Sequence, residues 1–279
     1  MDWQKLNGDI LNKVSRYLNF AERSIDANQV DEVAACGVDR QRAMELLFAN
    51  YLDLDAAEQR YYLPYMLKRL DKSTYQKDAY YANISFDYAS NGNWQLKKDF
   101  YAPYEVFVRD DFVYDFQKVL PQLGYFDEVF EYPAVYQDGR LWMSVTPNEI
   151  NTMKEPISRA GGKTLTFGLG LGYFAYMCSL KEEVSSVTIV EKDKRVIQLF
   201  EQYILPQFVC KDKINIVCDD AYDFLDKMHD GEYDYAFVDI YHDAGDGIIA
   251  YQKFKRILGD KYGKTQFDFW IEKTIKYYI

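Results

Sequence analysis

The chain has few of the residues from which metal and redox sites are built. Its 279 residues include two histidines, His229 and His242, and four cysteines, none of them in a C-x-x-C spacing. A structural zinc site needs about four such ligands at close spacing, so the sequence predicts no metal site. Scattered cysteines are typical of thiols that stay reduced, and we therefore expect a cytoplasmic protein without disulfides.

Long apolar runs and an excess of basic residues are also missing from the sequence. No stretch approaches the roughly 18 apolar residues of a membrane span. The opening MDWQKLNGDI has neither the basic flank nor the apolar core of a signal peptide. The net charge is −11, which disfavours nucleic acid, because a phosphate backbone is bound by Lys and Arg. We expect a small-molecule substrate, with no membrane or nucleic-acid partner.

Apolar residues are abundant, and at the start of the chain they recur mostly at the spacing of helices. Hydrophobic residues make up 48% of the sequence, enough for a sizeable core. Residues 1–95 show mostly helical spacing, which predicts an N-terminal helical domain. The first helical face contains Leu6, Ile10, Val14, Leu18 and Phe20.

A short β element is predicted to follow, over residues 96–145. The segment YEVFVRDDFVYDF has an extended pattern. Asp138-Gly139 stands between alternating apolar residues, which is a strong signal for a two-residue hairpin turn. The sequence therefore predicts a small sheet between the helical domain and the rest of the chain.

Strand and helix patterns alternate through the third predicted domain, residues 146–279. Four apolar strand-like runs, TLTF, SVTIVE, KINIVC and YDYAFVD, are separated by helical patterns. Continuous apolar strands are typical of a parallel sheet covered by helices on both faces, so we predict a Rossmann-like α/β domain. The last segment, TQFDFWIEKTIKYYI, fits either a strand or a helix, and we expect a sheet that is truncated on its C-terminal side.

The stretch TPNEI begins this third domain with a helix-start pattern. Thr146, Pro147 and Glu149 stand at the N-cap, N1 and N3 positions of a predicted helix. This spacing indicates a capping box, with proline at a position where its missing N–H costs nothing. A ligand-facing role for Glu149 is the alternative interpretation.

Three glycines follow the first strand of the predicted parallel sheet. Gly168, Gly170 and Gly172 have the spacing G-x-G-x-G, and Tyr173 stands where a dinucleotide-binding G-x-G-x-x-G motif has its third glycine. Three glycines within five residues predict that a ligand approaches the backbone closely. A simple tight turn is the alternative interpretation. The spacing disfavours a nicotinamide cofactor.

Acidic residues end the next three strands. Glu191 ends the second strand, where a carboxylate can accept hydrogen bonds from both hydroxyls of a ribose. Asp219 and Asp220 end the third strand, where they can also cap the following helix, and Asp239 ends the fourth. The carboxyl ends of parallel strands lie along one edge of a sheet, so we expect these groups around one ligand site.

With these motifs in place, residues 146–258 resemble the spermidine synthase-like branch of the class I S-adenosylmethionine (SAM) methyltransferase fold. The resemblance is carried by TPNEI, LTFGLGLG, VTIVEKD and YDYAFVDIYHD. It implies SAM or decarboxylated SAM as the cofactor, with adenine held by an Asp at the third strand end and the next backbone N–H. The implied cofactor-binding residues are Gly168, Leu169, Gly170, Gly172, Glu191, Lys192, Asp219, Asp220, Ala221 and Asp239.

Departures from the family pattern narrow the expected reaction. Spermidine synthases carry an Asp at the position of Leu171, and they read D-S-S-D where this chain reads DIYHD. We therefore predict a SAM-dependent methyltransferase acting on a small amine or hydroxyl acceptor. The expected catalytic residues are Asp239, assisted by Tyr241, His242 or Asp243. Aminopropyl or alkyl transfer, and a SAM- or nucleoside-binding protein without catalysis, are the alternatives.

Two expectations concern how the site is completed. A truncated sheet leaves its substrate roof to residues 1–145 or to another subunit. An aromatic-rich chain with uncovered apolar surface is expected to bury that surface against a copy of itself, which predicts a homodimer.

Overall fold

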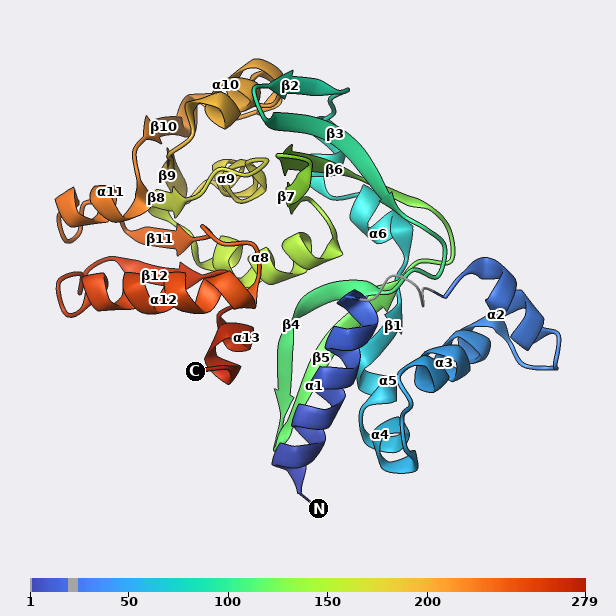
Figure 1. Ribbon diagram of the computed structural model, residues 1–279. Coiled ribbons are helices and arrows are strands. Elements are labelled where there is room, and N and C mark those ends of the chain that lie inside the picture. Colours follow the sequence, from blue (N-terminus) through green and yellow to red (C-terminus); the bar gives the residue numbers. More distant parts are fainter. Residues whose placement is uncertain (1, 20–24) are drawn as a thin grey trace. The chain divides into compact units, whose positions relative to one another are not determined.

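The computed structural model describes residues 2–19 and 25–279 (Figure 1). By its internal contacts the chain divides into two compact units. The first unit comprises Met1–Tyr75 and Phe100–Glu131, and the second comprises Gln76–Asp99 and Tyr132–Ile279. Within the described residues, no helix is both long enough and apolar enough to span a bilayer.

The first unit consists mainly of helices packed on a three-stranded sheet of order β1-β5-β4. Its central strand, β5, is almost entirely buried, and α1 and α5 pack against it. The amphipathic face of α1 buries Ile10 and Val14, as predicted, whereas Phe20 lies outside the described residues. The elements are α1 (Trp3–Asn19), α2 (Ala27–Ala34), α3 (Arg40–Tyr51), α4 (Ala56–Tyr61), α5 (Leu63–Met66), β1 (Leu67–Arg69), α6 (Lys72–Gln76), β4 (Phe107–Asp115) and β5 (Lys118–Tyr125).

A four-stranded sheet of order β2-β3-β6-β7 lies mostly in the second unit, and its β2/β3 and β6/β7 pairs are antiparallel. Strands β6 and β7 pair with Gln137 opposite Arg140, so the turn is the predicted two-residue hairpin. Asp138 and Gly139 have φ angles of 53° and 76°, as a type I′ turn requires. The elements are α7 (Ala79–Asn83), β2 (Ala89–Asn91), β3 (Trp94–Tyr101), β6 (Phe130–Gln137) and β7 (Arg140–Ser144).

A five-stranded, fully parallel sheet forms the core of the second unit, with the order β10-β9-β8-β11-β12. This order confirms a Rossmann-like α/β fold. The C-terminal segment forms both predicted alternatives in succession, a strand and then a helix. The elements are α8 (Pro147–Arg159), β8 (Gly162–Phe167), α9 (Tyr173–Ser179), β9 (Val184–Glu191), α10 (Lys194–Tyr203), the 3₁₀ turns Leu205–Gln207 and Lys211–Lys213, β10 (Ile214–Cys218), α11 (Ala221–Lys227), β11 (Tyr235–Val238), α12 (Ala244–Leu258), β12 (Gln266–Phe269) and α13 (Glu272–Tyr277).

The strand order also places the site. The chain runs outward from β8 through β9 to β10, then returns to β11 on the other side of β8 (Figure 1). In open parallel sheets ligands bind outside the carboxyl ends of the strands at this reversal point. Here the glycine turn follows β8, and Asp239 follows β11. The fold therefore brings the predicted glycine and acidic residues to one edge of the sheet.

Candidate functional site

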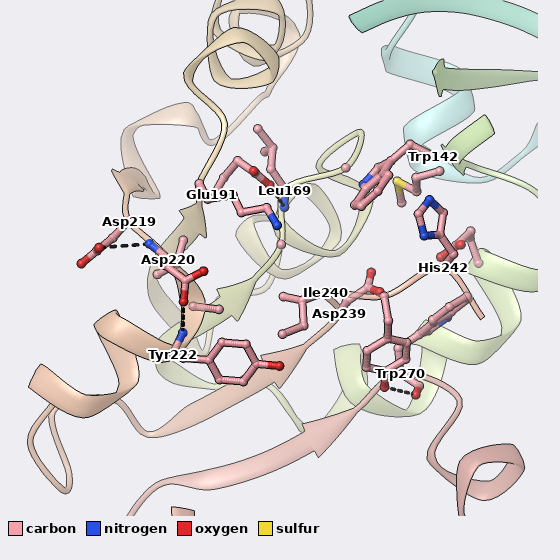
Figure 2. Close-up of a pocket in the computed structure, with 18 residues that line it drawn as sticks. Trp142, Leu169, Glu191, Asp219, Asp220, Tyr222, Asp239, Ile240, His242 and Trp270 are labelled. Carbon is pink, nitrogen blue, oxygen red and sulfur yellow. Dashed lines mark hydrogen bonds between the residues drawn. The ribbon is translucent and has the colours of Figure 1, made fainter. Parts of the chain in front are cut away.

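A cavity of about 270 Å³ opens at the carboxyl ends of the parallel strands (Figure 2). Most of the residues predicted from sequence line it, whereas Gly172 and Asp243 do not. The lining residues are Trp142, Met143, Glu149, Gly168, Leu169, Gly170, Val190, Glu191, Lys192, Asp219, Asp220, Ala221, Tyr222, Asp239, Ile240, Tyr241, His242 and Trp270.

The three glycines of the turn are required by the protein itself. All three have φ between 51° and 99°, a backbone region that disfavours side chains. A Cβ at Gly168 would lie 1.9 Å from the backbone oxygen of Asp239, and one at Gly172 would lie 2.4 Å from the ring of Phe200. A Cβ at Gly170 would lie 2.3 Å from the sulfur of Met143. The expectation that a ligand alone explains these glycines is therefore too simple.

Glu191 ends β9 beside the glycine turn. Its Oε2 accepts a hydrogen bond from the Leu169 N–H at 3.4 Å, and its Oε1 accepts one from the Asp193 N–H at 2.8 Å. Burial raises the pKa of Glu191, and the backbone bonds partly oppose that shift. These bonds hold the carboxyl group at the cavity wall, next to the turn.

The two aspartates after β10 play different parts. Asp220 is the N-cap of α11, and its Oδ1 accepts hydrogen bonds from the N–H groups of Tyr222 and Asp223. Because both bonds go to Oδ1, the cap does not use Oδ2. The Asp219 carboxylate points away from the cavity in Figure 2 and pairs with Lys227 at 2.8 Å, which lowers its pKa. Asp220 is therefore the better placed of the two for contact with a ligand.

Glu149 does not form the capping box that the sequence suggested. Thr146 is the N-cap of α8, but its side chain makes no capping hydrogen bond. Glu149 instead lines the cavity with only 8% of its surface exposed, and its Oε2 has no hydrogen-bond partner among the described residues. A buried carboxyl oxygen without a partner is costly, so Glu149 is a candidate for contact with a ligand rather than a helix cap.

Asp239 lies at the end of β11 in the same cavity. Burial raises the pKa of Asp239 to about 7. Burial also raises the pKa of Glu149 well above its ordinary value, and the nearby Asp239 raises it further. Two carboxyl groups in one cavity do not ionise together easily, so the pair retains a proton near neutral pH.

The remaining predicted catalytic residues are held by the protein. The Tyr241 hydroxyl donates to the backbone oxygen of Trp270 at 2.5 Å, and Asp243 is the N-cap of α12. The His242 Nδ1 lies 3.2 Å from Asp246, and its ring contacts the edge of Trp142 with centroids 4.0 Å apart. Of these three residues, Tyr241 and His242 line the cavity, and the His242 ring lies beside Trp142 (Figure 2).

Sequence patterns did not identify several cavity residues. Trp142 and Met143 come from β7 of the hairpin, within the range 1–145 that was expected to supply a roof. Tyr222 and Trp270 come from α11 and the loop after β12. No local motif marks these residues, since each reaches the cavity only through tertiary packing.

The charge of the cavity is strongly acidic. Its lining includes five carboxyl groups and one lysine, Lys192. Such a lining attracts cationic ligands and repels phosphates. Among the described residues, no group of three or more His, Cys, Asp and Glu side chains is placed to hold a metal ion.

Comparisons with known proteins give only partial matches. No protein-family model matches the chain, and no curated protein matches its sequence. A precorrin 8W decarboxylase encoded in the Methanobacterium thermoautotrophicum genome aligns with a TM-score of 0.32 and 23% identity, over 42% of this chain and 58% of its own.

Two spermidine synthase structures align in a similar way. The enzyme from Thermotoga maritima aligns with a TM-score of 0.35 and 16% identity, over 48% of this chain and 50% of its own. A spermidine synthase in complex with the transition-state analogue AdoDATO aligns with a TM-score of 0.31 and 16% identity, over 40% of this chain and 43% of its own. The chain thus spans about half the length of the solved structures that it matches. The strand order, rather than these likenesses, carries the fold assignment.

Proposed function

We propose that the cavity binds SAM and that the protein transfers the methyl group to a small-molecule amine or hydroxyl acceptor. The observation that carries the proposal is the presence of two differently placed acids in one cavity. Glu191, at the end of β9, is positioned to hold a ribose, and Asp239, at the end of β11, has a pKa suited to a base near neutral pH.

The cavity lining fits an adenosyl ligand with a positive sulfur. The Glu191 carboxylate is an acceptor for ribose hydroxyls, and the Asp220 Oδ2 is an acceptor for the amino group of adenine. The excess of acids favours a sulfonium cation. The same excess disfavours the pyrophosphate of a dinucleotide, because Lys192 is the only lysine or arginine in the lining.

Asp239 is the residue to which we assign proton transfer. Bound SAM supplies an electrophilic methyl group, and the protein has to orient the acceptor and remove its proton. The acceptor N–H or O–H would lie against Asp239, which would take the proton as the acceptor atom bonds to the methyl carbon. The methyl–sulfur bond of SAM breaks in the same step, and S-adenosylhomocysteine is the leaving group. A base with a pKa of about 7 is ionised in a large fraction of molecules at neutral pH, while it still binds a proton effectively.

Glu149 keeps the charge of the carboxyl pair low. We assign the proton that the pair retains to Glu149, because burial and the charge of Asp239 both raise the pKa of Glu149. The buried pair then carries one negative charge rather than two, and Asp239 is the base. We assign Glu149 the role of a neutral neighbour with a free hydrogen-bonding oxygen in the cavity.

A second candidate is aminopropyl or related alkyl transfer from decarboxylated SAM. One observation favours it. An amino-acid tail carries a carboxylate, which the acidic lining repels, whereas the decarboxylated tail is cationic. The two candidates use the same nucleoside contacts and the same base, so they differ in the tail of the donor and in the group transferred.

The experiment that separates these functions is a transfer assay with two donors. Purified protein is incubated with methyl-labelled SAM or with decarboxylated SAM, each with a panel of amines, phenols and other hydroxyl compounds. Our proposal predicts labelled product with SAM and at least one acceptor. Transfer with decarboxylated SAM alone would replace it with the second candidate. Tight SAM binding without transfer to any acceptor would indicate a binding protein.

A further inference from the structure

Met143 lies directly on the glycine turn. It comes from β7, and its sulfur accepts a hydrogen bond from the Leu171 N–H at 3.0 Å. A Cβ at Gly170 would lie 2.3 Å from the same sulfur, so the side chain fills the space next to the turn. Met143 also lines the cavity. The protein thus places its own thioether between the turn and the ligand space.

Three other N–H groups of the turn, those of Gly168, Leu169 and Gly172, have stronger acceptors than sulfur. Gly168 donates to the Val190 carbonyl at 2.9 Å, and Gly172 donates to the Leu169 carbonyl at 2.8 Å. The Leu169 N–H donates to the Glu191 carboxylate. Only the Leu171 N–H is bonded to sulfur, which is a weak acceptor, on a side chain with three rotatable bonds. Among these donors, the Leu171 N–H is the one that a ligand can take over at the lowest cost.

A carboxylate is the ligand group that gains most by replacing the Met143 sulfur as the acceptor of the Leu171 N–H. Its hydrogen bond to a backbone N–H is charge-assisted and stronger than a bond to a thioether. Few other groups in the cavity suit a carboxylate, because the lining offers one lysine against five acids. A nucleoside without an amino-acid tail has no carboxylate to accept the Leu171 N–H, so Met143 stays in place.

We propose that Met143 is a specificity-determining residue that occupies the Leu171 N–H and must be displaced by the carboxylate of an amino-acid-bearing nucleoside. This inference rests on the proposed function, which supplies an adenosyl ligand with its sugar at Glu191. It adds a residue that sets how much the amino-acid tail contributes to affinity. Met143 therefore lowers the advantage of SAM over nucleosides without the tail.

Two substitutions of Met143 shift this competition in opposite directions. Met143→Ala removes the side chain and leaves the Leu171 N–H open to the ligand. Met143→Gln keeps a similar length and offers an amide oxygen, which accepts a hydrogen bond more strongly than sulfur does. A general loosening of the fold would change both variants in the same direction, so opposite effects identify the competition itself.

The test is isothermal titration of each protein with two ligands. S-adenosylhomocysteine carries the amino-acid carboxylate, and 5′-methylthioadenosine shares its nucleoside and thioether but lacks the tail. We expect Met143→Ala to bind S-adenosylhomocysteine about five-fold more tightly than the unsubstituted protein, and Met143→Gln to bind it about five-fold more weakly, as the net worth of one hydrogen bond suggests. Affinity for 5′-methylthioadenosine should stay within about two-fold, since no contact to it changes.

The outcomes separate this inference from the proposed function. Thermal unfolding without ligand shows whether each variant is folded. Equal changes for both ligands, or no change for S-adenosylhomocysteine in either folded variant, would overturn the role of Met143. If neither ligand binds the unsubstituted protein, the proposed function fails, and the inference about Met143 fails with it.

Discussion

Glu149 and Asp239 line the same cavity at the end of the parallel sheet, where burial raises the pKa of Glu149 and the nearby Asp239 raises it further. Glu149 comes from the first turn of α8, and Asp239 follows β11, 90 residues later in the chain. Burial raises the pKa of both carboxyl groups, and the charge of Asp239 raises that of Glu149 further. This pair links the stability of the fold to pH.

The first prediction concerns the pH dependence of stability. Glu149 and Asp239 both have folded-state pKa values above those of the unfolded chain, so the folded state holds their protons more tightly. Their contribution to stability is therefore fully present below the unfolded-state pKa values, and it is lost as the pH rises through the folded-state values. Glu149→Gln removes one ionisation and keeps the shape. We expect its free energy of unfolding, measured by urea denaturation from pH 5 to pH 9, to fall less steeply than that of the unsubstituted protein.

A matched control for this series is Glu183→Gln. Glu183 is a highly exposed carboxyl group outside the cavity, and its side chain pairs with Lys181. The control is expected to keep the pH slope of the unsubstituted protein between pH 6 and pH 9. If the slope for Glu149→Gln matches the slope for Glu183→Gln, Glu149 is not a buried acid with a raised pKa.

The second prediction assigns the base. Asp239→Asn keeps the size of the side chain and cannot take a proton, so turnover should fall about 10²-fold or more. Binding of S-adenosylhomocysteine should change little, because the proposed nucleoside contacts lie at Glu191 and Asp220. In the unsubstituted protein, turnover should rise with pH through about 7 as Asp239 ionises.

The measurement is a pH profile of kcat for the unsubstituted protein and for Asp239→Asn, together with a binding titration. Asp212→Asn, at an exposed position in a 3₁₀ turn, serves as the matched control. Full activity in Asp239→Asn would remove Asp239 from the mechanism. Loss of nucleoside binding in the same variant would show that the ligand is oriented differently.

The third prediction concerns the glycine turn. Gly170 has φ of 51°, and an added Cβ would approach the Met143 sulfur to 2.3 Å. Gly170→Ala should therefore lower the free energy of unfolding by about 2 kcal/mol or more, combining backbone strain with steric overlap. In a Met143→Ala background the overlap disappears while the strain remains, so the cost of Gly170→Ala should be smaller there.

Urea denaturation of the four proteins in this double-mutant cycle measures the coupling. Gly263→Ala is the control, because an added Cβ at Gly263 meets nothing within 4 Å, and we expect a change within about 0.5 kcal/mol. If Gly170→Ala lowers the free energy of unfolding equally with and without the Met143 side chain, the added Cβ does not overlap the Met143 sulfur.

Much of the fold followed from local patterns. The four apolar strands and the Asp138-Gly139 hairpin were predicted because each pattern is long enough to show its period. Strands β1 and β2 were missed, because each has only three residues and three residues carry no recognisable alternation. The acidic residues predicted at the strand ends lie close together in the structure, because the carboxyl ends of parallel strands lie along one edge of the sheet.

The site was less predictable than the fold. Glu149 fits a capping box in sequence, and only tertiary structure shows that it is buried beside Asp239. Met143 carries no signal at all, because its contact with Leu171 joins two segments that are far apart in the chain. A glycine turn can likewise be required by a ligand or by the protein, and the sequence alone does not distinguish the two causes.

The central claim is that Glu191 holds the ribose of an adenosyl ligand in this cavity. The most direct test is isothermal titration of S-adenosylhomocysteine into the unsubstituted protein, Glu191→Ala and the exposed control Glu183→Ala. Hydrogen bonds to a charged group contribute about 1.5–3 kcal/mol each, so Glu191→Ala should bind at least ten-fold more weakly, while Glu183→Ala keeps its affinity. Binding that is equally tight in Glu191→Ala, or absent in the unsubstituted protein, would contradict the account.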